Sequence, residues 1–247
     1  MSLPVAILAG GMATRLKPIT ENTPKALLDI NGEPFISHQL KLLRSKGIIR
    51  VVICTGYLGE MIRDFVGNGA RFGIQVEYSF DGDSLLGTGG AVKKALPLLG
   101  KHFFVLYGDS YLPCNYKAVE AAFRDSGKKG LMTVFHNDGA RDTSNVEFEN
   151  GQILSYEKQR LTPRMRHIDY GLSVFQRGAF AYVPKDTPYD LADLYQLLLE
   201  KGELAAFEVE QRFYEIGSVG GLEELKKYIN WAKGEGQKVK GEGDSDE

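Results

Sequence analysis

Short apolar runs alternate with longer amphipathic segments over the first half of the chain. The apolar runs are rich in β-branched and aromatic residues and predict buried strands, at Val5–Leu8, Arg50–Thr55, 74–78 and 103–107. The amphipathic segments have helical spacing, at 35–46, 58–66 and 90–99. Strands that alternate with helices in this way predict an α/β fold, with helices on both faces of a mostly parallel sheet.

The pattern changes after about residue 130, where strand-like runs follow one another without long helices between them. We expect strands at 131–135, 144–149, 153–157 and 168–175, some of them antiparallel, and helices at 191–201 and 220–231. The last stretch, 234–247, contains almost no apolar residues. Such a stretch cannot bury enough surface to order itself, so it predicts a mobile tail.

Composition and charge narrow the class of protein. The 247 residues are 43% hydrophobic and 25% charged, which is ordinary for a globular protein. The net charge of −2 argues against a nucleic-acid-binding surface, and no apolar run is long enough to span a bilayer. Cys54 and Cys114 have no metal-ligand spacing, and a disulfide between them stays open. Because a strand begins almost at once, we expect no signal peptide and a reduced, cytoplasmic protein.

The first candidate for chemistry is the stretch that follows the first strand. Gly10 and Gly11 form a turn that leads to Arg15 and, after Pro24, to Lys25. Small residues let backbone N–H groups approach an anion, and two cations suit a polyphosphate. The stretch lacks the Gly-Lys-Ser/Thr of a P-loop and the G-x-G-x-x-G of a dinucleotide fold. The alternative is a tight glycine turn with surface cations.

A second glycine-rich block, Leu86-Gly87-Thr88-Gly89-Gly90-Ala91, opens the helix expected near residue 90. Three glycines would be costly inside a helix. At a helix N-terminus they let a base or a phosphate approach the backbone. The alternative is a flexible loop with a glycine-rich start.

Two carboxylates are candidates for a metal site. Asp109 follows the buried strand at 103–107, where a carboxylate is well placed to hold Mg²⁺. It could equally cap a helix. Glu215, within the run 213–218, could complete the site, although acidic residues are common at strand ends.

These features occur together and in order, and in that combination the chain resembles the sugar-1-phosphate nucleotidyltransferase family. The family opens with Leu-Ala-Gly-Gly-x-Gly-Thr-Arg-Leu and Pro-Lys, followed by Leu-Gly-Thr-Gly and a Gly-Asp after a central strand. Glu-Lys-Pro, Asn-Ala-Gly and Asp-Ile-Gly-Thr come later. Counterparts of all of these lie between about residues 3 and 231. The chain is most similar to heptose-1-phosphate and short mannose-1-phosphate guanylyltransferases, with MurNAc-1-phosphate uridylyltransferases as close relatives.

The resemblance implies a fold and a reaction. The fold is a Rossmann-like, GT-A-type three-layer sandwich with a mixed, mostly parallel sheet and a small β-rich sugar-binding part. One domain, 1–233, would hold a nucleotide-binding half at about 1–130 and a sugar-binding half at about 131–233. The reaction transfers a nucleoside monophosphate from an NTP to a sugar 1-phosphate with Mg²⁺ as cofactor, and releases pyrophosphate. GTP is the favoured donor, UTP and CTP are possible, and the protein would be a monomer or a homodimer.

The resemblance also implies roles for individual residues. Those assigned to catalysis are Arg15, Lys25 and Asp109, and those assigned to Mg²⁺ are Asp109 and Glu215. Residues assigned to the nucleotide are Leu8, Ala9, Gly10, Gly11, Gly87, Thr88 and Gly89. Residues assigned to the sugar phosphate are Glu157, Lys158, Asp169 and Gly171.

Four departures from the family pattern leave other functions open. Ala13 replaces a glycine, Gln159 a proline, Tyr170 an alanine and Glu215 an aspartate. Three of these lie on the sugar side, so the acceptor is the least defined part of the prediction. The alternatives are a cytidylyltransferase that acts on a non-sugar phosphate or phosphonate, and a non-catalytic relative that senses nucleotide sugars.

Overall fold

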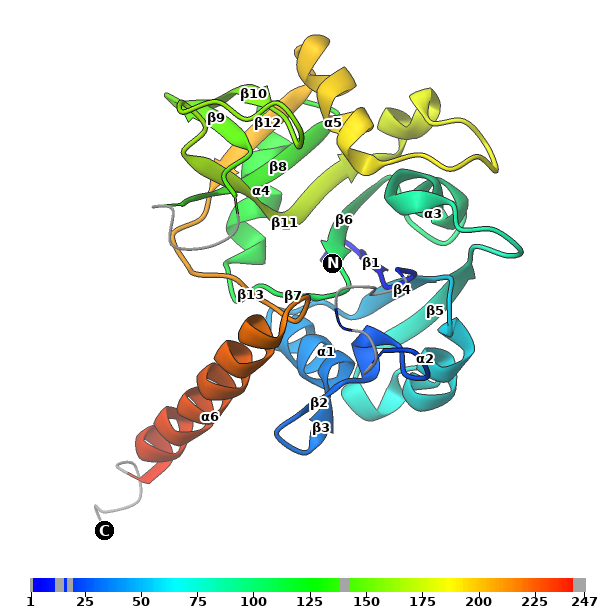
Figure 1. The fold of residues 1–247 in the computed structure, drawn as a ribbon, viewed down its shortest axis with the longest axis vertical. Helices are drawn as coiled ribbons and strands as arrows, with labels where there is room; N and C mark the ends of the chain where they lie inside the picture. Colours follow the sequence, from blue (N-terminus) through cyan, green and yellow to red (C-terminus); the bar gives the residue numbers. More distant parts are fainter. Residues whose placement is uncertain (1, 12–15, 17–19, 138–142, 242–247) are drawn as a thin grey trace.

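The computed structural model describes residues 2–11, 16, 20–137 and 143–241. A nine-stranded sheet forms the centre of this part of the chain, in the order β10-β9-β11-β6-β1-β4-β5, with β8 beside β11 and β12 beside β8 (Figure 1). Its strands are β1 (Val5–Leu8), β4 (Arg50–Thr55), β5 (Gln75–Phe80), β6 (His102–Tyr107), β8 (Gly130–His136), β9 (Val146–Glu149), β10 (Gln152–Tyr156), β11 (His167–Gln176) and β12 (Leu204–Glu208). Two small sheets pair β2 (Asp29–Ile30) with β3 (Glu33–Pro34) and β7 (Ser110–Tyr111) with β13 (Tyr214–Glu215).

Helices connect and cover these strands. The α-helices are α1 (Phe35–Ser45), α2 (Gly59–Val66), α3 (Gly87–Ala95), α4 (Tyr116–Ser126), α5 (Leu191–Glu200) and α6 (Val219–Gly241). Short 3₁₀ turns occur at η2 (Lys25–Leu27), η3 (Ala70–Phe72) and η4 (Arg177–Tyr182).

The sheet is parallel in its first half and mixed in its second. β1 lies between β4 and β6, and β5 extends the same parallel set. β11 then runs antiparallel to both β6 and β8, with a register shift between Asp169 and Ser173. Because the parallel strands end at the same edge, the loops after β1, β4, β5 and β6 are brought together there.

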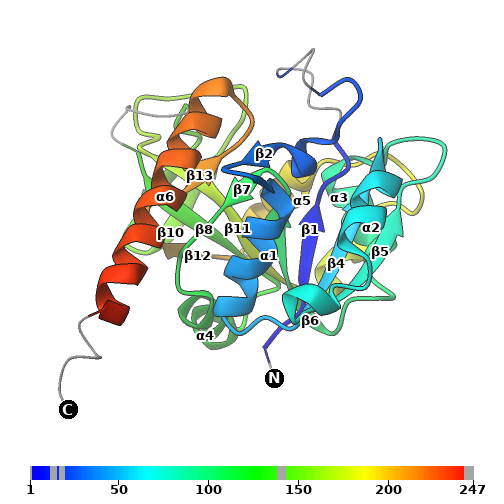
Figure 2. The same ribbon diagram turned by 90° about the horizontal axis from the view of Figure 1, so that it is seen from below.

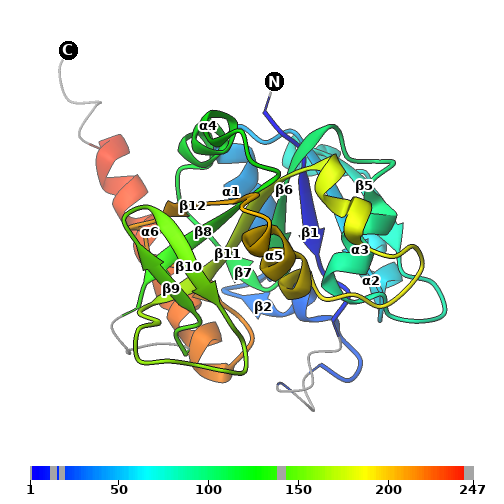
Figure 3. The same ribbon diagram turned by 90° about the horizontal axis from the view of Figure 1, so that it is seen from above.

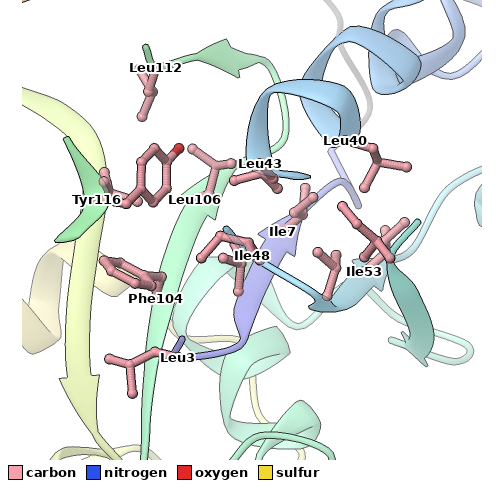
Figure 4. Packing of buried hydrophobic residues seen from close by; sticks show 14 of the residues in the cluster. Leu3, Ile7, Leu40, Leu43, Ile48, Ile53, Phe104, Leu106, Leu112 and Tyr116 are labelled. Carbon is pink, nitrogen blue, oxygen red and sulfur yellow. The ribbon is translucent and has the colours of Figure 1, made fainter. Parts of the chain in front are cut away.

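Two hydrophobic clusters fill the two faces of the sheet. Val5 and Ile7 of β1 pack with α1, α2 and α4 on one face, whereas Ala6 packs with α3 and α5 on the other. This alternation follows from the two-residue period of a strand. Figure 4 shows the first cluster, in which Ile7 lies among side chains from α1 and from the neighbouring strands. Helices on both faces make a three-layer α/β fold, so the predicted fold class is confirmed.

Helix α4 is absent from the sequence-based expectation, although the sequence carries its signals. The side chain of Asn115 accepts a hydrogen bond from the Ala118 N–H at 3.2 Å, as a helix cap does. The helix ends at Gly127, whose φ of +63° is the left-handed conformation common after helices. The apolar residues Val119 and Phe123 face the sheet between these two signals.

Helix α6 continues beyond the expected end at residue 231. Its first turns bury Leu222, Leu225 and Ile229 beside β2 and α1, and the helix then projects from the body as far as Gly241 (Figures 1 and 2). The expectation of a mobile tail from residue 234 stays a prediction: the chain is helical as far as Gly241, and 242–247 lie outside the described residues. Once a helix is nucleated by packing, each added residue gains a hydrogen bond, which explains the extension. In the described part of the chain, no helix is long and apolar enough to cross a membrane.

Candidate functional site

A cavity of about 230 Å³ opens at the carboxyl ends of the parallel strands. Its lining comes from the ends of β1, β4 and β6, from the loops after β1, β5 and β6, from η2 and from the start of α3, which are distant in sequence. The lining residues are Leu8, Ala9, Gly10, Gly11, Lys25, Ala26, Cys54, Asp81, Leu85, Gly87, Thr88, Ala91, Tyr107, Gly108 and Asp109. Eight of the residues predicted from the sequence are among them, and this is the edge at which α/β proteins bind ligands.

Two glycines allow the loops at this edge to pack closely. The N–H of Gly108 donates to the carbonyl of Leu8 at 2.9 Å, and a Cβ at Gly108 would lie 2.4 Å from that oxygen. A Cβ at Gly10 would lie 3.0 Å from the backbone nitrogen of Gly56. A side chain is excluded at Gly108, and one at Gly10 would require the backbone of Gly56 to shift, so both glycines allow the close packing seen at the cavity.

Lys25 and Asp109 form an ion pair at the cavity. Lys25 Nζ donates to Asp109 Oδ2 at 2.9 Å, and the two side chains are 18% and 34% exposed. Lys25 begins η2 directly after Pro24, whose φ of −63° fixes the approach of the chain. Asp109 follows β6, and its carbonyl accepts from the N–H of Ile216 at 2.9 Å. The pair brings together two residues that the resemblance assigns to catalysis, and their roles toward the phosphates and the metal stay predictions.

The glycine block at the start of α3 is explained by packing as well as by the cavity. Gly87 and Thr88 line the cavity, but Gly89 does not. The N–H of Gly89 donates to the carbonyl of Tyr189 at 2.8 Å, and a Cβ at Gly89 would lie 2.8 Å from the Tyr189 ring. A Cβ at Gly90 would meet the carbonyl of Thr187 at 2.8 Å. The segment before α5 therefore packs against Gly89 and Gly90, whereas Gly87 and Thr88 remain in the lining of the cavity.

Asp81 is a cavity residue that sequence reasoning missed. It follows β5, it is 8% exposed, and its Oδ2 accepts from the N–H of Leu86 at 3.1 Å. Burial raises the pKa of Asp81, while the Leu86 N–H and the charge of Lys94 oppose the rise. The available signal was its position directly after a strand, which is the argument used for Asp109. Burial also raises the pKa of Cys54 to about 12, so its thiol is uncharged at neutral pH.

The residues predicted for the sugar phosphate lie beside the cavity rather than in its lining. A Cβ at Gly171, where φ is +93°, would lie 3.2 Å from the ring of Tyr107, which lines the cavity. Asp169 Oδ1 accepts from the Gly171 N–H at 3.0 Å. Burial raises the pKa of Asp169 to about 6, against the lowering effects of the Gly171 N–H and of Lys158. Glu157 is held by a backbone bond to Asn145 at 3.0 Å.

Glu215 lies opposite Ser110, the residue after Asp109, but its carboxylate is hydrogen-bonded to residues that follow it in the chain. β13 pairs with β7, which sets Glu215 opposite Ser110. The carboxylate accepts from the Gly217 N–H and, at 2.7 Å, from the Ser218 hydroxyl, both just before α6. Within the described ranges, no three His, Cys, Asp or Glu side chains cluster to hold a metal. The metal role of Glu215 stays a prediction, and Arg15 and Ala13 lie outside the described residues.

Glycine loops and a Lys–Asp pair at the carboxyl edge of a parallel sheet define a nucleotide-binding type of α/β protein. The nucleotidyl transferase family profile matches residues 5–230, and the chain belongs to this family.

Individual relatives agree with this assignment. The chain is 28% identical to UTP–glucose-1-phosphate uridylyltransferase of Synechocystis, over 86% of the chain and 60% of that protein. It is 27% identical to D-glycero-alpha-D-manno-heptose 1-phosphate guanylyltransferase of Campylobacter jejuni, over 85% of the chain and 93% of that protein. The structure of HddC from Yersinia pseudotuberculosis complexed with GMP-PN matches with a TM-score of 0.77 and 25% identity, covering 92% and 99% of the two chains. The chain thus spans about 60% of the cyanobacterial relative and nearly all of the other two.

Proposed function

We propose that this protein transfers a nucleoside monophosphate from an NTP to a sugar 1-phosphate, giving an NDP-sugar and pyrophosphate. The observation that carries the proposal is the Lys25–Asp109 pair in a cavity built from glycine loops. Backbone N–H groups and a lysine suit the triphosphate, and the neighbouring carboxylate suits a divalent cation. Membership of the nucleotidyl transferase family supports the same reaction.

The residues of the site are arranged for alignment and charge neutralisation. A phosphate oxygen of the sugar 1-phosphate attacks the α-phosphorus of the NTP, and the bond to the β-phosphate oxygen breaks as pyrophosphate leaves. Lys25 neutralises charge on the reacting phosphates, and the glycine loops hold the donor in place. No covalent intermediate with the protein is needed, which agrees with a cavity whose one cysteine, Cys54, is buried and uncharged.

Mg²⁺ fits the donor set at Asp109. Mg²⁺ prefers hard oxygen ligands and is commonly held by one or two carboxylates together with substrate phosphates, so a three-residue cluster is not required. The Asp109 carboxylate lines the cavity and is about one-third exposed. Glu215 accepts one hydrogen bond on each carboxylate oxygen, from the Gly217 N–H and the Ser218 hydroxyl, and each oxygen keeps a lone pair with which it could join Asp109. The bound ion would supply charge stabilisation for the phosphates.

Asp81 supports GTP as the favoured donor. Asp109 follows β6 and Asp81 follows β5, so three strand spacings, about 14 Å, separate the two ends of the cavity. This span suits a nucleotide with its phosphates at Asp109 and its base at Asp81. A carboxylate offers only acceptors, and guanine presents adjacent N–H donors that it can bind in pairs.

The acceptor would bind on the β11 side of the cavity. Gly171 lies beside the ring of Tyr107, and burial raises the pKa of Asp169 although the charge of Lys158 opposes the rise. Lysine suits a phosphate, and a carboxyl suits sugar hydroxyls. We further propose a reducing, cytoplasmic location, since both cysteines are free and buried. A monomer or a homodimer remains the expectation for the oligomeric state.

A pyrophosphate-release screen tests the proposal. Purified protein with Mg²⁺ is combined with each of four NTPs and a panel of sugar 1-phosphates, with phosphocholine and a phosphonate as non-sugar acceptors. Release with GTP and one sugar 1-phosphate is expected. Pyrophosphate release only with CTP and a non-sugar acceptor would show a cytidylyltransferase that acts on a non-sugar substrate. Binding of nucleotide sugars without any pyrophosphate release would show a non-catalytic protein that senses nucleotide sugars.

A further inference from the structure

Asp190 lies between the wall of the nucleotide cavity and the predicted acceptor side. It directly precedes α5 and was not singled out by the sequence motifs. Its Oδ1 accepts from the hydroxyl of Thr88 at 3.0 Å, and Thr88 lines the cavity. Its Oδ1 and Oδ2 accept from Lys158 Nζ at 3.2 and 3.0 Å. One carboxylate therefore contacts a cavity residue and the predicted acceptor-binding lysine at the same time.

The backbone around Asp190 is fixed to the same cavity wall. The N–H of Leu191 donates to the Thr88 hydroxyl at 2.7 Å, and the N–H groups of Gly89 and Gly90 donate to the Tyr189 carbonyl. Helices α3 and α5 lie side by side as a result (Figure 3). The position of the Asp190 carboxylate relative to the nucleotide cavity is thus set by several independent hydrogen bonds.

Asp190 is also ionised, and its carboxylate is the ion-pair partner that holds the Lys158 side chain in place. Although burial alone would raise the pKa of Asp190, the Ala192 N–H, Lys158 and Thr88 together lower the pKa below its usual value. The side chain of Lys158 is 45% exposed, and Asp190 is the acidic partner found for it in the described part of the chain. A lysine has a long flexible stem, and without a partner it would have to lose rotamer freedom when the acceptor binds.

We propose that Asp190 is a positioning residue, which holds Lys158 beside the nucleotide cavity so that its ammonium is in place for the phosphate of the acceptor. This role rests on the proposed function and deepens it. The ammonium keeps a donor available while Asp190 accepts from it, because lysine has three donors. Through Thr88, the same carboxylate ties the acceptor-binding lysine to the wall of the donor site.

The test separates positioning from helix capping. Asp190 also accepts from the Ala192 N–H at 3.0 Å and so caps α5. Asn caps a helix as well as Asp does and can still accept from Thr88, so Asp190→Asn removes the charge that holds Lys158 but preserves the fold. We expect the acceptor KM to rise about fivefold, as for a partly exposed ion pair, with the NTP KM changed less than twofold.

A double-mutant cycle and a matched control complete the experiment. Lys158→Met should raise the acceptor KM at least as much, and adding Asp190→Asn to it should change nothing further. Asp186→Asn is the control, because Asp186 lies on the same loop, is exposed, and has a φ of +51° that Asn adopts readily.

Each outcome bears on a different claim. An active protein in which Asp190→Asn leaves the acceptor KM unchanged overturns this inference alone, as does a double variant whose effects simply add. An equal rise in the NTP KM would show a general disturbance of the site and would also overturn it. A wild-type protein without turnover overturns the proposed function and this role with it.

Discussion

Lys25 Nζ lies 2.9 Å from Asp109 Oδ2, although 84 residues separate the two in the chain. Lys25 comes from the 3₁₀ turn after Pro24, and Asp109 from the loop after β6. Neither segment has a local reason to approach the other. The parallel pairing of β1 with β6 brings the two loops to one edge of the sheet, where Gly108 packs against Leu8.

Asp109→Asn should abolish turnover without unfolding the protein. The change removes the charge that suits a divalent cation but keeps the shape, and a side chain about one-third exposed contributes little to stability. We expect kcat to fall at least about a hundredfold in pyrophosphate release. The exposed Asp125 on α4 gives the matched control, Asp125→Asn, which should behave as wild type. Retained activity in Asp109→Asn would remove this residue from the reacting site.

Asp81→Asn should reduce the preference of the protein for GTP over UTP. Asn presents a donor as well as an acceptor and pairs less well with two adjacent N–H groups of guanine, while its oxygen can still accept from the Leu86 N–H. We expect kcat/KM with GTP to fall about 10- to 100-fold and kcat/KM with UTP to change much less. The ratio of the two values is the measurement. An unchanged ratio would place the base elsewhere.

Gly87→Ala should destabilise the fold. Gly87 has a φ of +69°, and a Cβ there would lie 2.8 Å from the Tyr189 carbonyl oxygen. Backbone strain and this contact together should cost about 1–3 kcal/mol of unfolding free energy, measured with denaturant. Gly178→Ala is the control, since a Cβ at Gly178 would have no atom within 4 Å. Equal stability of the two variants would contradict the close packing of α3 against the segment before α5.

Asp169→Asn should change how stability depends on pH. The pKa of Asp169 is raised in the folded protein from 3.8 to about 6, mainly by burial. The carboxyl of Asp169 therefore loses its proton at a higher pH in the folded state than in the unfolded state. As the pH rises from about 4 to 6, this difference progressively lowers the free energy of unfolding. The variant has no such loss, so its advantage in unfolding free energy should grow across this range and reach roughly 3 kcal/mol at pH 7. Parallel stability curves for the two proteins from pH 4 to pH 7 would refute the shifted pKa.

Much of the fold follows from local patterns in the sequence. The apolar runs predict β1 and β4 with the bounds that the structure shows, because a buried strand needs apolar residues on both faces. The spacing of apolar residues predicts α1 and α5 within one residue of their ends. α4 was missed even though a cap at Asn115, a stop at Gly127 and apolar residues at helical spacing were present in the sequence.

The sequence predicted which residues form the candidate site better than it predicted how they contact one another. The motifs identified Lys25, Asp109 and the two glycine loops, since these residues are recognisable within short stretches. Asp81 was missed because an acidic residue after a strand has no distinctive neighbours. Glu215 was identified, but the sequence could not show that its carboxylate is engaged by the Gly217 N–H and the Ser218 hydroxyl.

The sequence by itself determined the α/β class through strand and helix periodicity, and it indicated the family and the type of reaction through the ordered motifs that carry the resemblance, because both are local properties of the chain. Tertiary structure alone decided which distant groups share a space. It set the Tyr189 backbone against Gly89, joined Thr88 and Lys158 through Asp190, and closed the Lys25–Asp109 pair. The physical reason is that sheet pairing and core packing choose these partners, and neither is encoded in any single segment.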